Sequence, residues 1–175
     1  MRVPVLALTA AVAAATATAP GYAATPFPTR KDGRWEMIMK SSGIVPVNMT
    51  MRQCTDPAEE RNGAALRDGG GPPQGTPGAE CKPGPVLPSP GGWSFSNTCT
   101  IKGGMTMATS GVARGDFNSG YHIDTTTRMT PAPIPQMAET KMTIDAKWLG
   151  PCPADMKPGD TIVNGRKISR PAPRG

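Results

Sequence analysis

Histidine is almost absent from this sequence of 175 residues, since His122 is the only one. A triad built on Ser or Cys needs a histidine base, and the alternation around His122 places this side chain on the solvent side of a strand. The carboxylates of Asp116, Asp124 and Asp145 lie near strand ends or at solvent-facing positions, and nothing in the sequence pairs them for acid–base catalysis. No Gly-Lys-Ser/Thr follows the glycine-rich runs, so a phosphate loop is not expected. We therefore predict a protein that is not an enzyme.

The sequence also lacks the closely spaced ligand pairs of structural zinc sites. Its four cysteines, Cys54, Cys81, Cys99 and Cys152, are separated by 26, 17 and 52 residues, and no C-x-x-C occurs. Structural zinc sites use tight pairs of Cys or His, so zinc is not expected. Despite a net charge of +6, no dense stripe of Lys and Arg interleaves with aromatic residues, so we expect no nucleic-acid partner.

Long apolar runs are confined to the N-terminus, and no transmembrane span is expected after it. Arg2 precedes the apolar run VPVLALTAAVAAATATA, and small residues occupy the −3 and −1 positions, Gly21 and Ala23. This pattern predicts a signal peptide over residues 1–23, cut between Ala23 and Ala24, and hence a periplasmic protein. The alternative is an N-terminal membrane anchor, which the Ala/Thr-rich composition and the missing stop-transfer pattern disfavour.

The remaining chain is expected to form one domain with a short tail. The β domain is placed at 24–152, with a Gly/Pro-rich insertion at 68–80. The tail, 153–175, holds five basic and two acidic residues, and its Asn164-Gly165 pair predicts a small terminal hairpin. Such a basic tail favours solubility, and weak contact with anionic surfaces of the cell envelope is the one partner interaction that we consider.

Apolar and polar residues alternate between the Gly/Pro-rich connections, which predicts strands. Six such strands are expected, at 34–40, 47–52, 93–101, 105–107, 121–129 and 141–148. Each has one apolar face, as antiparallel sheets show. The predicted fold is mainly β: a single antiparallel meander that curves toward a half-barrel. One short helix is expected over 57–66, because Asp56, Pro57 and Glu59 match an N-cap, N1 and N3.

The strand register predicts how the cysteines pair in this disulfide-stapled fold. Folding 81–87 back on 93–99 sets Leu87 opposite Trp93 and Cys81 opposite Cys99, and directly opposed cysteines are close enough to bond. The other pair is then Cys54 with Cys152, which ties the beginning of the sheet to its end. Prolines in 83–88 imply that this arm is an edge of the sheet.

Methionine recurs at every second position in three places, which raises two functional alternatives. The apolar face is predicted to contain Trp35, Met37, Met39, Met49, Met51, Trp93, Phe95, Met105, Met107, Met142 and Trp148. Methionine fills irregular gaps in cores, so these residues are first of all expected to supply core packing. No resident cofactor is expected. The first alternative is a Cu(I) site, because soft thioethers select this ion; its ligands would be drawn from Met37, Met39, Met49, Met51, Met105 and Met107. The second is a carrier of an apolar or lipid-like ligand.

The order of the motifs is similar to that of a known family. The segments GRWEMIMK, MTMRQCTDPAE, CK, SNTC, MTMATSG, GYHIDTTTRM and WLGPCPADMKPGD resemble an exported proteobacterial family catalogued as domain of unknown function 3617. The resemblance covers about residues 33–165. It implies periplasmic residence and a mostly antiparallel β fold, and it brings no activity, cofactor or site residue. Together these features predict a non-catalytic structural or binding module.

Overall fold

The structure is a computed structural model that describes residues 28–43, 46–61 and 78–168. In these ranges it contains ten strands and a five-residue helix. The elements are β1 (Arg34–Ser42), β2 (Val47–Cys54), α1 (Pro57–Arg61), β3 (Ala79–Pro83), β4 (Leu87–Ser89), β5 (Gly92–Ile101), β6 (Met105–Gly115), β7 (Gly120–Thr130), a 3₁₀ turn at Pro135–Met137, β8 (Glu139–Gly150), β9 (Thr161–Val163) and β10 (Arg166–Ile168). The predicted signal peptide lies outside the described residues.

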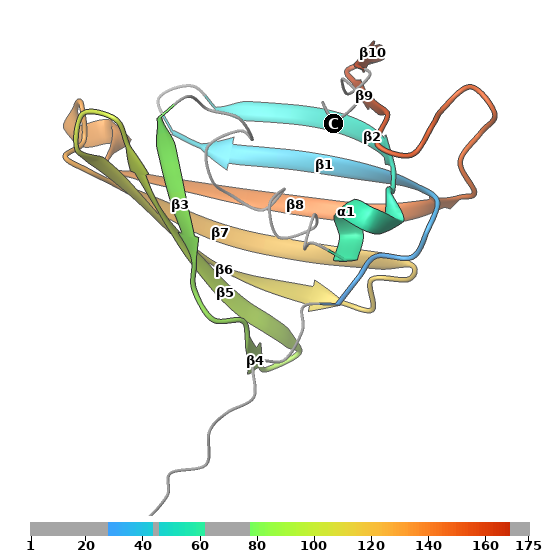
Figure 1. The fold of residues 1–175 in the computed structure, drawn as a ribbon, viewed down its shortest axis with the longest axis horizontal. Helices are drawn as coiled ribbons and strands as arrows, with labels where there is room; N and C mark the ends of the chain where they lie inside the picture. Colours follow the sequence, from blue (N-terminus) through green and yellow to red (C-terminus); the bar gives the residue numbers. More distant parts are fainter. Residues whose placement is uncertain (1–27, 44–45, 62–77, 169–175) are drawn as a thin grey trace, which may run out of the picture.

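All strands belong to one antiparallel sheet in the order β10-β9-β2-β1-β8-β7-β6-β5-β3, with β4 also paired to β5. The mainly β, antiparallel fold is therefore confirmed. Strands β5 to β8 form a meander, whereas the β1–β2 hairpin joins it through β1 and β8, which are far apart in the sequence. The sheet curls around the side on which α1 lies (Figure 1).

Four strands were not among the six predicted, and each is short. Strands β3 and β4 form the proline-containing arm, which lies at an edge of the sheet as expected. Strands β9 and β10 are the terminal hairpin, with Asn164 and Gly165 both at positive φ in its turn. Ala79 and Glu80, placed in the insertion 68–80, already belong to β3, and the rest of that insertion up to residue 77 lies outside the described residues.

The helix prediction is confirmed at its start. The Asp56 carboxylate accepts a hydrogen bond from the Ala58 N–H at 2.9 Å, as an N-cap does. The assigned helix ends at Arg61, and the predicted continuation to residue 66 lies in the part of the chain that the structure does not describe. The helix positions Glu60, whose carboxylate reaches into the core.

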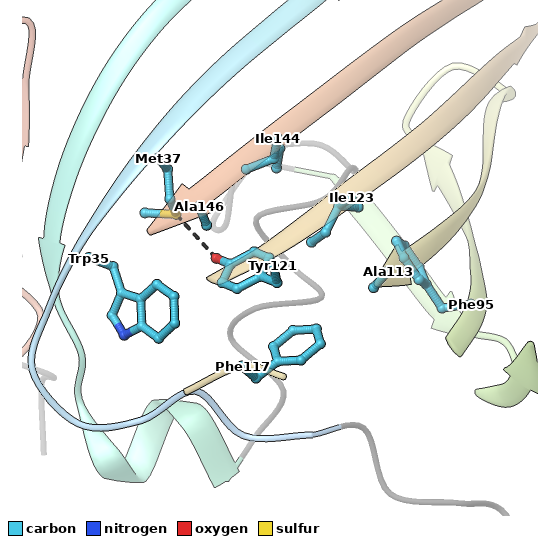
Figure 2. Packing of buried hydrophobic residues seen from close by; sticks show 9 residues of the cluster. All are labelled: Trp35, Met37, Phe95, Ala113, Phe117, Tyr121, Ile123, Ile144 and Ala146. Carbon is cyan, nitrogen blue, oxygen red and sulfur yellow. Dashed lines mark hydrogen bonds between the residues drawn. The ribbon is translucent and has the colours of Figure 1, made fainter. Parts of the chain in front are cut away.

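The core forms on the concave side of the sheet, from residues of one parity on each strand and from Phe117 of the β6–β7 turn (Figure 2). The buried cluster consists of Trp35, Met37, Phe95, Ala113, Phe117, Tyr121, Ile123, Ile144 and Ala146. Because side chains on a strand point alternately to the two faces, this register leaves charged residues on the convex side. Gly111 is opposite Phe95, and a Cβ there would lie 2.6 Å from the Phe95 ring, so the missing side chain makes room for that ring.

Both predicted disulfides are present. Cys81 is directly opposite Cys99 and bonded to it, and Cys54 is bonded to Cys152 across 98 residues of sequence. The predicted register of the arm was wrong further along, since Leu87 is opposite Ser94 and not Trp93. The arm is split into two strands, between which the Gly84 N–H donates to the Ser96 carbonyl, and this irregular segment shifts the pairing by one residue.

Candidate functional site

The eleven residues predicted to form an apolar face all occupy the concave parity of their strands, but they differ in burial. Trp35 and Met37 are fully buried, and Phe95 is 5% exposed. The others are partly buried: Met39, Met49, Met51, Trp93, Met105, Met107, Met142 and Trp148. Of these, Met39, Met51, Trp93, Met142 and Trp148 pack against the buried cluster. The face is therefore fully buried core at Trp35, Met37 and Phe95 and partly buried at the other eight residues.

The methionines fall into two groups. On β1 and β2, Met37 is directly opposite Met51, and Met39 is directly opposite Met49. On β6 and β7, Met107 is opposite Met129 and next to Cys99, so that Cys81, Cys99, Met107 and Met129 form one row across four strands. Strands β8 and β7 lie between β1 and β6 in the sheet, so the six methionines of the copper alternative lie in two separate groups along it. Met129 was not among the predicted site residues.

A buried polar network closes one end of the concave face. Arg30 precedes β1, and its guanidinium forms an ion pair with Glu60 of α1; both side chains are at most 4% exposed. Arg30 Nη1 also donates to the Tyr121 hydroxyl at 3.2 Å and to the Met37 sulfur at 3.6 Å. The Tyr121 hydroxyl in turn donates to the same sulfur at 3.4 Å (Figure 2). This network ties the N-terminal segment and α1 to the core.

The β6–β7 turn closes the same end by inserting Phe117. Its ring is fully buried, stacks on Tyr121 at a centroid distance of 4.8 Å and meets Trp93 edge-on at 5.7 Å. Phe117 has a φ of 55°, an uncommon conformation for a bulky residue. The Asp116 carboxylate holds the turn by accepting hydrogen bonds from the N–H groups of Ser119, Asn118 and Gly120, and these bonds lower the pKa of Asp116 well below its ordinary value.

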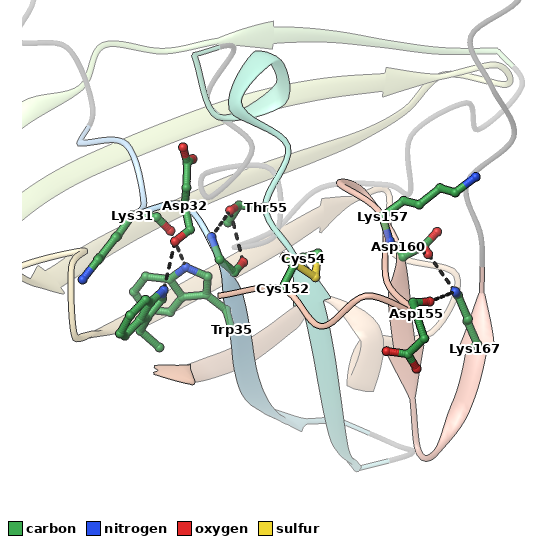
Figure 3. Close-up of a disulfide and its surroundings, with 12 residues drawn as sticks. Lys31, Asp32, Trp35, Cys54, Thr55, Cys152, Asp155, Lys157, Asp160 and Lys167 are labelled. Atoms are coloured by element: carbon green, nitrogen blue, oxygen red, sulfur yellow. Dashed lines mark hydrogen bonds and ion pairs between the residues drawn. A yellow bond between two sulfur atoms is a disulfide. The ribbon is translucent and has the colours of Figure 1, made fainter. Parts of the chain in front are cut away.

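The Cys54–Cys152 disulfide anchors the beginning of the tail to β2 (Figure 3). The Cys54 N–H donates to the Asp160 carbonyl at 3.0 Å, and the Gly159 N–H donates to the Cys54 carbonyl at 2.9 Å. Lys167, one of the basic tail residues, forms an ion pair with Asp160 at 2.9 Å. The first part of the tail thus folds onto the sheet. Its strand β9 pairs with β2 and adds to the edge of the sheet.

Trp148 lies between solvent and the core near this disulfide. Its indole N–H donates to the Asp32 carbonyl at 3.1 Å, and the Lys31 ammonium lies 3.8 Å from its ring centroid. A cation over an indole face is a favourable contact. The segment before β1 therefore covers Trp148. This tryptophan is less accessible to a ligand than the other partly buried residues of the apolar face that no such segment covers.

His122 lies on the convex side, as its parity predicted, and it bridges two carboxylates. Nδ1 is 2.7 Å from Asp145 Oδ1, and Nε2 is 3.0 Å from Asp124 Oδ1. Asp124 also pairs with Arg114 at 2.9 Å. The hydrogen bond with Asp145 raises the pKa of His122 above its ordinary value. Partial burial opposes this rise, and the hydrogen bond and charge of Asp124 add to it. The cluster joins β6, β7 and β8 on the outer face of the sheet.

We expect the stability of the protein to fall slightly as His122 loses its proton. Because the folded-state pKa is raised, the contribution of the imidazolium is complete below the ordinary histidine pKa and disappears as the pH rises through the folded value. The groups are half-exposed, so the loss is less than about 1 kcal/mol. Urea titrations across this pH range should show it in the native protein and not in His122→Gln. An equal pH slope in both proteins would contradict this assignment.

Neither a metal cluster nor a membrane helix is found in the described part of the chain. No group of three or more His, Cys, Asp and Glu residues at 28–43, 46–61 and 78–168 is arranged to hold a metal ion. No helix in these ranges is long and apolar enough to cross a membrane.

The comparisons with known proteins agree with the sequence motifs. A protein-family model described as "Protein of unknown function (DUF3617)" matches residues 30–152. The chain belongs to this family. The DUF3617 match begins at Arg30, the buried arginine of the polar network, and ends at Cys152, the second half of the longer disulfide. Neither the search of curated proteins nor the search of solved structures gave a match.

Sequence reasoning missed three residues that complete the closed end of the face: Arg30, Glu60 and Phe117. Arg30 and Phe117 lie outside the regular strands, and Glu60 is on the helix. A strand pattern carries no information about such positions. One signal was present for Phe117, because Asp-Phe-Asn-Ser-Gly combines turn residues with one large apolar side chain.

Proposed function

We propose that this DUF3617 protein is an exported, non-catalytic binding module of the periplasm that takes up an apolar or lipid-like ligand on its concave face. The observation that carries the proposal is the ring of partly buried apolar residues around a fully buried centre. Soluble proteins rarely leave a continuous apolar surface without a use. Methionine suits such a surface, since its flexible side chain adapts to ligands of different shape.

Two further observations support export. The structure has two disulfides, which form and persist in oxidising compartments such as the periplasm. The first 23 residues have the composition of a cleaved signal peptide. Intact-mass measurement of protein purified from the periplasm tests this directly. A mature chain that begins at Ala24 supports it, whereas an uncut chain in the membrane fraction contradicts it.

Ligand uptake is tested with Met39→Asp and Met51→Asp. Both side chains are partly buried on the concave face, so a carboxylate there would place a charge in the proposed site. We expect each variant to fold and to lose the fluorescence gain of an apolar probe such as N-phenyl-1-naphthylamine. Native mass spectrometry of the unsubstituted protein should in parallel show a carried-over apolar molecule.

Thr50→Asp is the matched control, because Thr50 lies between Met49 and Met51 on β2 but points to the other face and is exposed. It should take up the probe as well as the unsubstituted protein. If Met39→Asp and Met51→Asp both fail to fold while Thr50→Asp folds, the whole face is core and the carrier proposal is wrong. If all three fold and bind the probe equally, the ligand site is not on this part of the face.

A further inference from the structure

Three methionines, Met39, Met49 and Met51, are neighbours on the same face of β1 and β2. Met39 is directly opposite Met49, and Met51 is two residues along β2 from Met49 on the same side. Directly opposed Cβ atoms are roughly 4.5–5.5 Å apart, and diagonal neighbours are within reach of long side chains. Each methionine has three rotatable side-chain bonds, so the three sulfur atoms can be directed to one point.

The fourth methionine of this block, Met37, is engaged elsewhere. Its sulfur accepts hydrogen bonds from both Arg30 and Tyr121, and the residue is fully buried. Met39, Met49 and Met51 are partly buried, so an ion from solvent can reach them while the surroundings remain largely apolar. The guanidinium of Arg30 forms an ion pair with Glu60, so the nearest buried cation is balanced by a buried carboxylate.

We propose that Met39, Met49 and Met51 form a three-thioether site for Cu(I). Thioether sulfur is a soft, neutral ligand that selects Cu(I) over Zn²⁺, Ca²⁺ and Mg²⁺. In the part of the chain that the structure describes, the β8 residues opposite Met39 and Met37 are Ile144 and Ala146, so β8 places no imidazole or carboxylate beside the three methionines. Such a ligand set favours Cu(I) over Cu(II), which prefers nitrogen and oxygen ligands. The site shares Met39 and Met51 with the apolar face proposed above, but the copper proposal does not rest on uptake of an apolar ligand.

Methionine-to-leucine substitution separates the two roles of these side chains. Leucine has a similar volume and is equally apolar, so a Leu replacement keeps the packing and any apolar uptake. It removes the sulfur and therefore the metal ligand. The test variant is Met39→Leu/Met49→Leu/Met51→Leu. The control variant is Met105→Leu/Met107→Leu/Met129→Leu, which removes three partly buried sulfurs from the second methionine group on β6 and β7.

Cu(I) affinity is measured by competition with bicinchoninate under anaerobic conditions. Ascorbate keeps the copper reduced, whereas a thiol would compete for the metal and reduce the two disulfides. The unsubstituted protein and the β6–β7 control should bind one Cu(I) with equal affinity. The β1–β2 variant should bind at least about tenfold more weakly, since even residues outside a ligand set contribute roughly 10–100-fold to metal affinity.

Methyl NMR with Ag(I), a redox-inert substitute for Cu(I), locates the ion. The ε-methyl signals of Met39, Met49 and Met51 should shift with one equivalent of Ag(I), while the Met37 signal stays in place. The proposal is overturned if the β1–β2 variant binds Cu(I) like the unsubstituted protein. It is also overturned if only the β6–β7 variant loses binding, or if the unsubstituted protein does not compete with bicinchoninate.

Discussion

Replacing Glu60 with glutamine is expected to lower the free energy of unfolding by about 3–5 kcal/mol, the range measured when one partner of a buried ion pair is removed. The Glu60 carboxylate accepts hydrogen bonds from Arg30 Nε, from Nη2 and from the Arg30 backbone N–H. Glutamine keeps the shape but carries no charge, so the guanidinium, which is 1% exposed, loses the carboxylate that balances it. Such a loss is a large part of the 5–15 kcal/mol that typical domains have. The measurement is urea unfolding followed by tryptophan fluorescence.

The double variant Arg30→Met/Glu60→Leu separates the charge effect from packing. Replacing both partners of a buried pair with apolar residues is often neutral or stabilising, although here the hydrogen bond from Arg30 to Tyr121 is also lost. We therefore expect the double variant to be more stable than either of its single variants, Arg30→Met and Glu60→Leu. Destabilisations that simply add would show that the two residues act independently, which would contradict the role of the ion pair.

The strands and disulfides could be predicted because they depend on a period of two. The alternation of Trp35, Met37 and Met39 fixes which side chains point inward, and the same parity on neighbouring strands places Cys81 opposite Cys99. Pairing Cys54 with Cys152 then follows by elimination. The arm around Leu87 was shifted by one residue because an irregular stretch has no period to count.

The closed end of the face could not be predicted in the same way. It depends on the pairing of β1 with β8, which brings Arg30 near Tyr121, 91 residues later in the chain. A buried arginine looks like any other charged residue in a sequence, since Arg is mostly exposed unless it is paired. The division of the methionines into two groups likewise depends on strand order, because parity alone places them on one face without setting the distance between them.

Replacing Phe117 with alanine is expected to destabilise the protein by about 3–5 kcal/mol, the usual range for a buried phenylalanine. The ring is fully buried, and its stacking on Tyr121 and edge contact with Trp93 are both lost. Aromatic pairs contribute about 0.5–1.5 kcal/mol beyond their buried area. Alanine retains the strain of a positive φ, so nothing offsets the loss at this position.

The control for this prediction is Ile38→Ala, an apolar residue of β1 on the convex side that is 37% exposed. It should change the free energy of unfolding by less than about 1 kcal/mol, because surface substitutions have small effects.

For Phe117→Ala we expect a lower urea midpoint with an unchanged slope, since the variant still folds to the same sheet. A slope that falls with the midpoint would show that the end of the sheet opens in the native state. Equal midpoints for the two variants would mean that Phe117 does not hold this end closed, and that the face is more accessible than its burial indicates.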